Sequence, residues 1–487
     1  MNNCHHFYSW IVFIGYLLLI VNVNFKIFIK KKTNPVSNIW IFILYFIPLF
    51  GIMIWFFFSE PYLGKRKTNL LKKIWKKNLV QIKKIKYYKN FFSKKNSRVA
   101  LPLFKLCKNR QGISGVTNNK LELLKNYKKV IKSLIKDISL AKKNIEMVFY
   151  IWQPGGIADE VAKALISSSK KGINCRLILD SAGSIKFFKS KWVYVMKKAN
   201  IKIVEALKIN VLKTFFRRID SRQHRKVVLI DNNISYIGSM NLVDPNLFKQ
   251  YCKIGQWIDL MIRVEGPIVT TIGIVYSCDW ELETGKKILP KLFISKNKEI
   301  SKKNYSTSMQ VIASGPGYTK QIIHQSLLTA IYSAKNQLTI TTPYLVPSSD
   351  LVHAICTASY RGVNVSIIIP KNNDSFMVKW ASRSFFSELL KSGVKIYLFE
   401  KGLLHSKSIL VDKQLSLVGT ANLDMRSLWL NFEITIAIDD KKFGKKLSYL
   451  HDEYISKSKL LDPKYWFLRS YWKKIIENFF YLFSPLL

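Results

Sequence analysis

Two stretches of this chain carry the same polar residues at the same spacing. Counted from a histidine, a lysine follows after two residues, an aspartate after seven, a glycine after fourteen and an asparagine after seventeen. The first set is His224, Lys226, Asp231, Gly238, Ser239 and Asn241, and the second is His405, Lys407, Asp412, Gly419, Thr420 and Asn422. Such agreement indicates one structural unit used twice, with both histidines at a common place.

These residue types suit the transfer of a phosphoryl group. A neutral imidazole is a nucleophile at pH 7 and an imidazolium is a proton donor, so two histidines can divide attack and leaving-group protonation. Lys226 and Lys407 would neutralise the non-bridging oxygens of a phosphate, and the hydroxyl and amide residues would hydrogen-bond the same oxygens. These predicted substrate-binding residues are Ser239, Asn241, Thr420 and Asn422. The scheme requires no metal and no cofactor.

Each motif is predicted to form a β-hairpin. Residues 226–230 and 407–411 are short apolar strands that end in a polar turn, and a second apolar strand follows each turn. Residues i and i+2 of a strand share a face, so each histidine points the same way as its lysine. Asp231 and Asp412 lie five residues beyond the lysines and therefore face away. We interpret these two members of the catalytic motifs as structural partners, for example in salt bridges.

The paired motifs resemble the His-x-Lys-x4-Asp motifs of the phospholipase D superfamily. Four further stretches narrow this resemblance to the bacterial cardiolipin synthases with two transmembrane helices. They are GQWIDL at 255–260, YSCDWE at 276–281, TPYLVP at 342–347 and NLDMRSLWLNFE at 422–433. The resemblance extends over almost the whole chain and is weakest between residues 65 and 120.

The resemblance implies a reaction and roles for particular residues. A cardiolipin synthase transfers a phosphatidyl group from one phosphatidylglycerol to another through a phosphohistidine, giving cardiolipin and glycerol. His224 matches the nucleophile and His405 the acid that later acts as a base, although the near-symmetry of the motifs leaves this order open. The family holds each imidazole with a downstream acid, for which Asp259 fits the first motif and Glu433 the second. A phospholipase D-type hydrolase, with water as acceptor, is the alternative.

Two apolar stretches near the beginning of the chain predict a membrane hairpin. Residues 7–25 and 39–58 each approach the roughly 20 residues that cross a bilayer. No Lys or Arg occurs in residues 1–6 and no small-residue cleavage site follows, which favours an uncleaved anchor over a signal peptide. The expected location is the bacterial inner (cytoplasmic) membrane. Lysines after Pro61 favour a cytoplasmic catalytic part, whereas residues 30–32, all lysine, argue for the opposite orientation.

The composition is strongly basic, with 78 Lys and Arg against 30 Asp and Glu and a net charge of +48. Such an excess is also typical of nucleic-acid-binding proteins. Here it is spread along the chain and accompanies abundant Ile, Asn, Phe and Tyr, so we expect phospholipids and the bilayer as partners rather than nucleic acid. The six cysteines have no paired spacing, and no metal site is predicted. The oligomeric state stays open.

Strands and helices alternate in the same order around both motifs. Predicted strands at 144–152 and 337–344 each precede a helix, a glycine turn and a further strand. This alternation predicts the α/β class, with two phospholipase D-like halves related by a pseudo-two-fold axis. The expected divisions are a transmembrane hairpin (1–60), a basic linker (61–120), the first half (121–295) and the second half with an aromatic, basic tail (296–487).

Three connecting regions carry their own expectations. Residues 206–223 are predicted to form a loop over the mouth of the site, and residues 282–308 connect the two halves. In the tail, aromatic residues between 466 and 483 mix with lysines. Either a helix packed on the core or a helix at the membrane interface fits this pattern.

Overall fold

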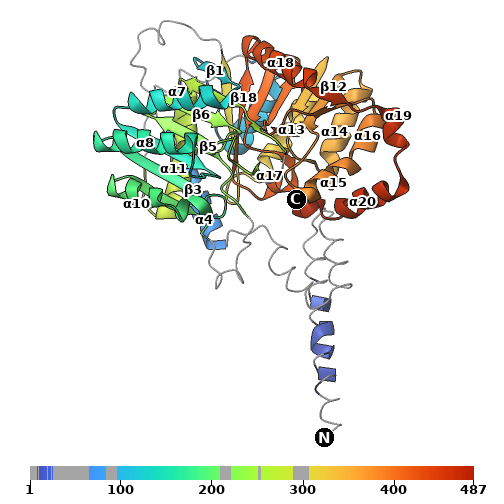
Figure 1. Ribbon diagram of the computed structural model, residues 1–487, viewed down its shortest axis with the longest axis horizontal. Coiled ribbons are helices and arrows are strands. Elements are labelled where there is room, and N and C mark those ends of the chain that lie inside the picture. The colour runs from blue at the N-terminus through green and yellow to red at the C-terminus, as the bar shows by residue number, and fades with distance from the viewer. Residues whose placement is uncertain are drawn as a thin grey trace.

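The computed structural model describes residues 65–83, 96–208, 221–250, 254–288 and 307–487, together with helical positions between 8 and 25. Two α/β lobes lie side by side, one built from residues before about 290 and the other from residues after 307 (Figure 1). The prediction of two α/β halves is therefore confirmed. Most of residues 1–60 and the connections at 209–220 and 289–306 lie outside the described residues, so the predictions for these segments do too.

The first half contains a seven-stranded mixed sheet in the order β1-β8-β6-β5-β2-β3-β4. Parallel pairing joins β2, β3 and β4, and antiparallel pairing joins the rest. The first motif spans the predicted hairpin, formed by β5 and β6. The strands are β1 (Lys120–Leu124), β2 (Asn144–Phe149), β3 (Asn174–Asp180), β4 (Lys202–Ala206), β5 (Lys226–Ile230), β6 (Ile234–Gly238) and β8 (Met261–Glu265).

The second half repeats this order and adds one edge strand, giving β9-β18-β16-β15-β10-β12-β13-β19. The second motif occupies the corresponding hairpin, β15 and β16. The strands are β9 (Ser308–Ser314), β10 (Gln337–Thr341), β12 (Asn364–Pro370), β13 (Lys395–Phe399), β15 (Ser408–Val411), β16 (Leu415–Gly419), β18 (Glu433–Asp439) and β19 (Ser458–Leu460). The hairpin β15-β16 takes the same place in the second sheet as β5-β6 takes in the first, so both motifs lie in the centre of their sheets.

Helices cover both faces of each sheet (Figure 1). The helices of the first half are α7 (Tyr127–Ser139), α8 (Ile157–Lys170), α9 (Ile185–Phe188), α10 (Lys191–Lys198) and α11 (Ile268–Thr284). Those of the second half are α13 (Ile322–Ser333), α14 (Ser349–Tyr360), α15 (Phe376–Ser384), α16 (Phe386–Lys391), α17 (Met425–Trp429) and α18 (Lys441–Ser456). The tail forms α19 (Pro463–Phe467), α20 (Tyr471–Tyr481) and a final 3-10 turn, η3 (Ser484–Leu486).

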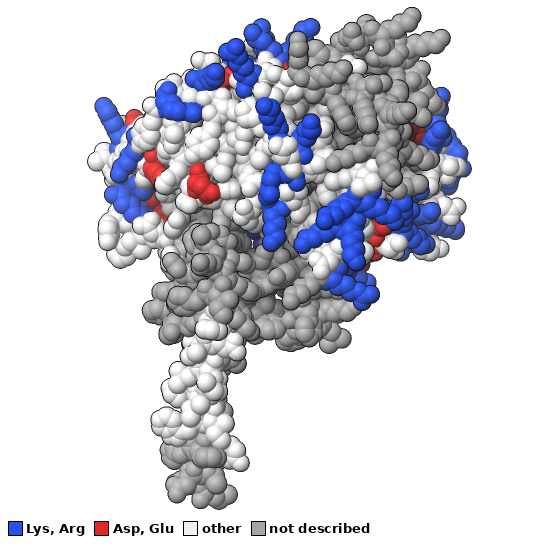
Figure 2. Space-filling view, turned by 180° about the vertical axis from the view of Figure 1, so that it is seen from behind, with Lys and Arg blue, Asp and Glu red and all other residues white. Residues whose placement is uncertain are grey.

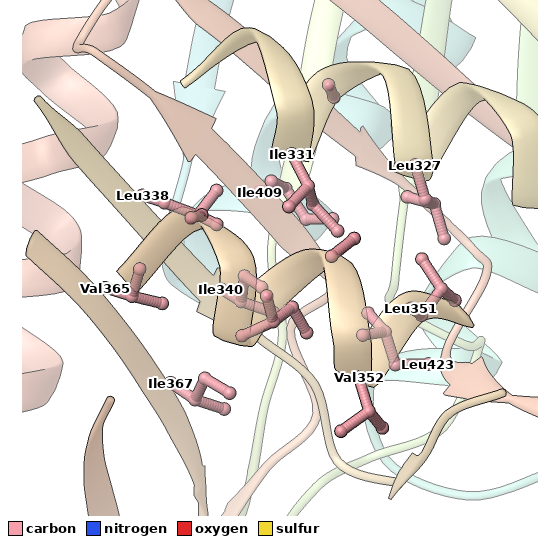
Figure 3. Close-up of a cluster of buried hydrophobic side chains, with 14 of the residues drawn as sticks. Leu327, Ile331, Leu338, Ile340, Leu351, Val352, Val365, Ile367, Ile409 and Leu423 are labelled. Carbon is pink, nitrogen blue, oxygen red and sulfur yellow. The ribbon is translucent and has the colours of Figure 1, made fainter. Parts of the chain in front are cut away.

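Alternate residues of the central strands enter different hydrophobic cores. In β5, Val228 and Ile230 join the outer core beneath α7 and α8, whereas Val227 and Leu229 join a core shared by both halves. Figure 3 shows the matching outer core of the second half, where α13 and α14 pack on β10 and β12. Burying one such aliphatic side chain contributes about 1.5–3 kcal/mol. The shared core fixes the two halves against each other and so fixes the seam where the motifs meet.

The region expected to be a linker contains two packed helices. Helix α4 (Lys65–Lys83) buries Leu71, Ile74 and Trp75 in the shared core, and α6 (Leu101–Gln111) buries Leu103 and other residues beside α13. The periodic apolar residues among the lysines were the signal for these helices. Among the described residues, no helix combines the length and apolarity needed to span a bilayer.

Candidate active site

Short strands join the two halves directly beside the histidines. β14 (Leu403–Leu404) pairs in parallel with β7 (Trp257–Ile258), and the amide of His405 donates to the carbonyl of Ile258 at 2.8 Å. In the same way, Gln223 pairs with Phe432, and the amide of His224 donates to the carbonyl of Phe432 at 3.0 Å. Each histidine is therefore anchored to a segment of the opposite half.

This pairing exchanges the expected carboxylate partners. Nδ1 of His224 lies 2.8 Å and 3.0 Å from the two carboxylate oxygens of Glu433, and Nδ1 of His405 lies 2.7 Å from Oδ1 of Asp259. The sequence-based assignment of Asp259 to the first motif and Glu433 to the second was wrong. The residue after Phe432 is Glu433, and the residue after Ile258 is Asp259, so the strand pairs at the seam bring each acid to the other half's histidine.

The motif hydroxyls hold these carboxylates. Ser239 Oγ donates to Asp259 Oδ1 at 2.6 Å, and Thr420 Oγ1 donates to Glu433 Oε2 at 2.5 Å. Since a hydroxyl has one proton to donate, neither residue offers it to a substrate in this arrangement, contrary to the sequence-based expectation. Each half therefore contributes a hydroxyl–carboxylate pair that holds the histidine of the other half.

The two motif asparagines are held differently. Oδ1 of Asn241 accepts from the amide of Ile151 at 3.2 Å, and Nδ2 of Asn422 donates to Asp424 at 2.9 Å. Both asparagines are buried beside the histidine-bearing hairpins. Their substrate-binding role stays a prediction.

The motif lysines are buried beside their own histidines. Lys226 Nζ donates to the carbonyl of His224 at 2.7 Å, and Lys407 Nζ donates to the carbonyl of His405 at 2.5 Å. Burial lowers the pKa of Lys226 to about 7 and that of Lys407 to about 8. An arriving phosphate anion would favour the charged ammonium forms.

The two motif aspartates lie away from the histidines, as the odd spacing predicts. Asp231 accepts the backbone amides of residues 142, 143 and 144, and Asp412 accepts those of residues 335, 336 and 337. Both sit at a hairpin turn with φ of 52° and 51°. Their carboxylates bind backbone amides rather than a basic side chain, so they brace the start of β2 and of β10 instead of touching the reacting groups.

Aromatic rings pack on both imidazoles. The Tyr150 ring lies 4.9 Å from His224, and the Trp257 ring lies 4.4 Å from His405. Sequence reasoning missed these contacts, although Tyr150 lies within the strand predicted at 144–152 and Trp257 lies two residues before Asp259. Each ring covers part of a buried imidazole.

A buried ion pair beneath His224 was also missed. Arg225 forms a salt bridge with Asp279, donates to the carbonyl of Glu433 and stacks on Tyr318. Arg225 and Asp279 are each almost wholly buried. The pair links the first motif to strand β18 of the second half, which carries the acid that holds His224.

Burial and neighbouring charges shape the ionisation of the site. Burial, together with both motif lysines, lowers the pKa of His224 well below its ordinary value and that of His405 to about 4. Each histidine feels the lysine of the other half, so the two sets share one electrostatic environment. Burial raises the pKa of Glu433 to about 7. Burial alone would raise the pKa of Asp259 too, but His405, Lys407 and the Ser239 hydroxyl bring it below its ordinary value.

The arrangement supplies two imidazoles whose Nδ1 atoms are occupied, leaving Nε2 of each for a reacting group. Two buried lysines stand beside them. In the part of the chain that the structure describes, no three His, Cys, Asp or Glu side chains cluster as a metal site. Such a set can perform covalent phosphoryl transfer with general acid–base assistance.

Comparison with known proteins agrees with this geometry. A family model described as cardiolipin synthase, phospholipase D-like domain, matches residues 134–253 and 327–454. The chain is 62% identical to cardiolipin synthase A of Buchnera aphidicola subsp. Schizaphis graminum (strain Sg) over 98% of both chains. It is 56% identical to that of Erwinia tasmaniensis over 98% of both, and 54% identical to that of Escherichia coli O1:K1 / APEC over 100% of both.

A solved structure shares the fold. Phosphatidylserine synthase of Haemophilus influenzae Rd KW20 superposes with a TM-score of 0.57 at 15% sequence identity, covering 79% of this chain and 98% of that one. At this identity the likeness concerns the arrangement of the two halves alone.

Proposed function

Because the chain belongs to the bacterial cardiolipin synthase family of the phospholipase D superfamily, we propose that its two exchanged histidine–carboxylate pairs divide one transfer reaction between them. Its activity is that of a cardiolipin synthase, a phosphatidyltransferase. The observation that carries the proposal is that each motif histidine is held at Nδ1 by an acid of the other half.

In the first step, Nε2 of His224 attacks the phosphorus of one phosphatidylglycerol. A phosphorus–nitrogen bond forms, the bond from phosphorus to the glycerol headgroup oxygen breaks, and glycerol leaves. His405 in its imidazolium form gives the leaving oxygen its proton. Lys226 and Lys407 balance the charge on the non-bridging oxygens as it builds.

In the second step, neutral His405 removes the proton from a headgroup hydroxyl of a second phosphatidylglycerol. That oxygen attacks phosphorus, the phosphorus–nitrogen bond to His224 breaks, and cardiolipin leaves. The protons balance over both steps, because His405 loses one and then regains one. His224 begins and ends neutral.

The acids beside the two histidines support this division of roles. The pKa of Asp259 lies below its ordinary value, so Asp259 is ionised at neutral pH and stabilises an imidazolium at His405. The pKa of Glu433 is raised to about 7, so Glu433 stabilises a positive charge on His224 less. In the free site burial holds the pKa of His405 near 4, and Asp259 offsets part of that burial. The phosphodiester anion of a bound lipid raises the pKa of His405 further, so we assign the proton donor to His405 and the neutral nucleophile to His224.

Purified full-length protein in detergent, given labelled phosphatidylglycerol, tests the proposal. Cardiolipin and glycerol in equal amounts are expected. Phosphatidic acid and glycerol without cardiolipin would instead support the hydrolase alternative, in which water takes the place of the second lipid. Quenching in denaturant at neutral pH, which spares the acid-labile phosphorus–nitrogen bond, and mapping of the phosphatidyl-bearing peptide identifies the nucleophile, which is expected to be His224.

We also propose that residues 1–60 form a transmembrane hairpin in the bacterial inner membrane. The support is the length and apolarity of residues 7–25 and 39–58, which suit two spans. The lipid substrates of the proposed reaction reside in the same bilayer. Protease protection of the full chain in inverted inner-membrane vesicles tests the orientation, with the catalytic part expected on the cytoplasmic side.

A further inference from the structure

Helix α20 turns its apolar stripe away from the protein. Trp472, Ile475, Ile476 and Phe479 follow the i, i+3, i+4, i+7 spacing of one helix face. All four are exposed, Trp472 by 73% and Phe479 by 54%. The buried residue of this helix is Glu477, which is 1% exposed. A core-packed helix shows the reverse distribution.

Strong contacts hold α20 in this orientation. Glu477 accepts hydrogen bonds from Arg383 of α15 and from Arg469, each at 2.9 Å. Phe480 packs edge-on against Phe376 of α15 at 5.4 Å. Two arginines bind the buried carboxylate of Glu477 and so fix the rotation of α20 about its axis. The outward orientation of the apolar stripe is therefore set by the fold.

The stripe extends into a larger surface of the tail. Tyr465, Leu468 and Tyr471 are each more than 70% exposed, and the exposed residues Lys464 and Lys473 lie among them. We define the tail patch as Tyr465, Leu468, Tyr471, Trp472, Ile475, Ile476 and Phe479. Apolar and aromatic side chains interleaved with lysines are typical of helices that lie in the headgroup region of a membrane.

The first half carries a matching patch. Ile185 of α9 and Tyr194 and Val195 of α10 are exposed among Lys186 and Lys191, and these residues define the α9–α10 patch. Figure 1 places α10 and α20 toward the same side of the molecule, and Figure 2 shows Lys and Arg crowded at the lower right, on the first half.

Both patches lie at the edge of the sheets that carries the motif histidines. Helix α9 follows the carboxyl end of β3. Helix α15, on which α20 packs, follows the carboxyl end of β12. At that edge of the first sheet, Asp180 accepts the amide of Gln223, the residue before His224, at 2.9 Å. The outward apolar residues and the histidines therefore share one edge of the two sheets.

We propose that the tail patch and the α9–α10 patch rest together on the surface of a bilayer containing anionic phospholipid, with the mouth of the site facing the headgroups. This inference rests on the proposed function, since that reaction draws both substrates from the membrane. A bilayer fits because it is flat enough to meet patches on both halves at once. Aromatic rings settle at headgroup level, and lysines are attracted to anionic lipid.

A depth probe tests this placement in the full chain. The variant carries Trp472→Cys with Cys4→Ser and Cys252→Ser, and an environment-sensitive fluorophore is attached at position 472. The described native cysteines, at positions 107, 175, 278 and 356, are buried. The protein is reconstituted in vesicles of phosphatidylethanolamine and phosphatidylglycerol, with or without brominated acyl chains. At least a twofold loss of emission is expected with brominated lipid.

Tyr449 provides the matched control. It is also 73% exposed, but α18, which carries it, lies on the opposite side of the molecule from α20 (Figure 1). Fluorophore at Tyr449→Cys in the same background should show no quenching. Equal quenching at both positions, or none at 472, overturns the proposal. Quenching requires no turnover, so this result is independent of whether the reaction itself is assigned correctly.

A kinetic measurement gives a second readout. In mixed micelles, Trp472→Glu with Phe479→Glu should raise the apparent KM for the surface concentration of phosphatidylglycerol about tenfold and leave kcat within about twofold, because the change weakens seating on lipid. Tyr449→Glu should change neither value. An unchanged KM in the double variant, or an equal change in the control, contradicts the proposed surface.

Discussion

Glu433→Gln tests whether an acid of the second half controls the histidine of the first. The Glu433 carboxylate is completely buried, and both its oxygens lie within 3.0 Å of His224 Nδ1. It therefore keeps the proton of a neutral imidazole on Nδ1 and leaves Nε2 free to attack. A glutamine can present its NH₂ group instead, which moves the imidazole proton to Nε2 and blocks attack.

The size of the effect follows from these contacts. Losing a hydrogen bond to a charged group costs about 1.5–3 kcal/mol, or roughly 10- to 150-fold in rate. The wrong tautomer adds to this loss, and the comparable replacement of the acid in a Ser-His-Asp triad costs about 10⁴-fold. We expect the formation of the phosphatidyl-enzyme to slow by about 10³- to 10⁴-fold.

The assay uses phosphatidyl-p-nitrophenol, whose leaving group needs no proton from His405. Rapid mixing should show a burst of p-nitrophenol from the unmodified enzyme. Glu433→Gln should lose that burst, whereas Asp259→Asn should keep it within about tenfold and lose steady turnover. The reverse pattern would make His405 the nucleophile, and equal loss in both variants would refute the division of roles. Circular dichroism checks that each variant is folded.

Four further outcomes are expected. Arg225→Ala leaves its buried aspartate partner unpaired and should lower the free energy of unfolding by about 3–5 kcal/mol in urea titrations, and a change below about 1 kcal/mol would contradict a paired site. Asp412→Ala strands three backbone amides at a turn and should lower stability by about 1–3 kcal/mol, seen as a lower Tm, with kcat unchanged at a temperature where the protein is folded. The pH profile of kcat/KM should fall on the acid side as Glu433 takes up a proton near pH 7, and on the alkaline side as Lys226 and Lys407 lose theirs near pH 7 and 8. Because bound phosphate favours the ammonium forms, the alkaline limb of kcat should lie at higher pH than that of kcat/KM, and coincident limbs would count against these lysines. Dialysis against EDTA should leave cardiolipin formation intact, and a loss restored by one transition metal alone would contradict the histidine mechanism.

Much of the fold was predictable because its signals are local. The central strands are continuous runs of apolar residues with a polar turn between them, and both motif hairpins form where these runs predict them. The helices at 65–83 and 101–111 were missed, because their apolar residues stand among basic residues and the whole of 61–120 was interpreted as a basic linker. Lysine side chains can cover a helix whose opposite stripe is buried, so a high charge does not exclude packing.

The sequence predicted most of the residues of the candidate site but not which residues contact one another across the two halves. The motif spacing identified the histidines, lysines and hairpin-bracing aspartates, since those relations depend on residues a few positions apart. It did not identify Tyr150 or Arg225, whose partners belong to other elements. A buried arginine inside a motif of a lysine-rich chain carries no sequence signal that separates it from a surface arginine.

The chemistry could be inferred from residue spacing, because two complete His-Lys sets at equal spacing specify a repeated unit suited to phosphoryl transfer. The identity of the acid that holds each histidine became clear from the folded chain. His224 and Glu433 are 209 residues apart, and His405 and Asp259 are 146 apart. Their pairing is set by short strands that join the halves at the seam. Spacing within a repeat places residues inside their own half, whereas contact between halves depends on how two finished sheets pack.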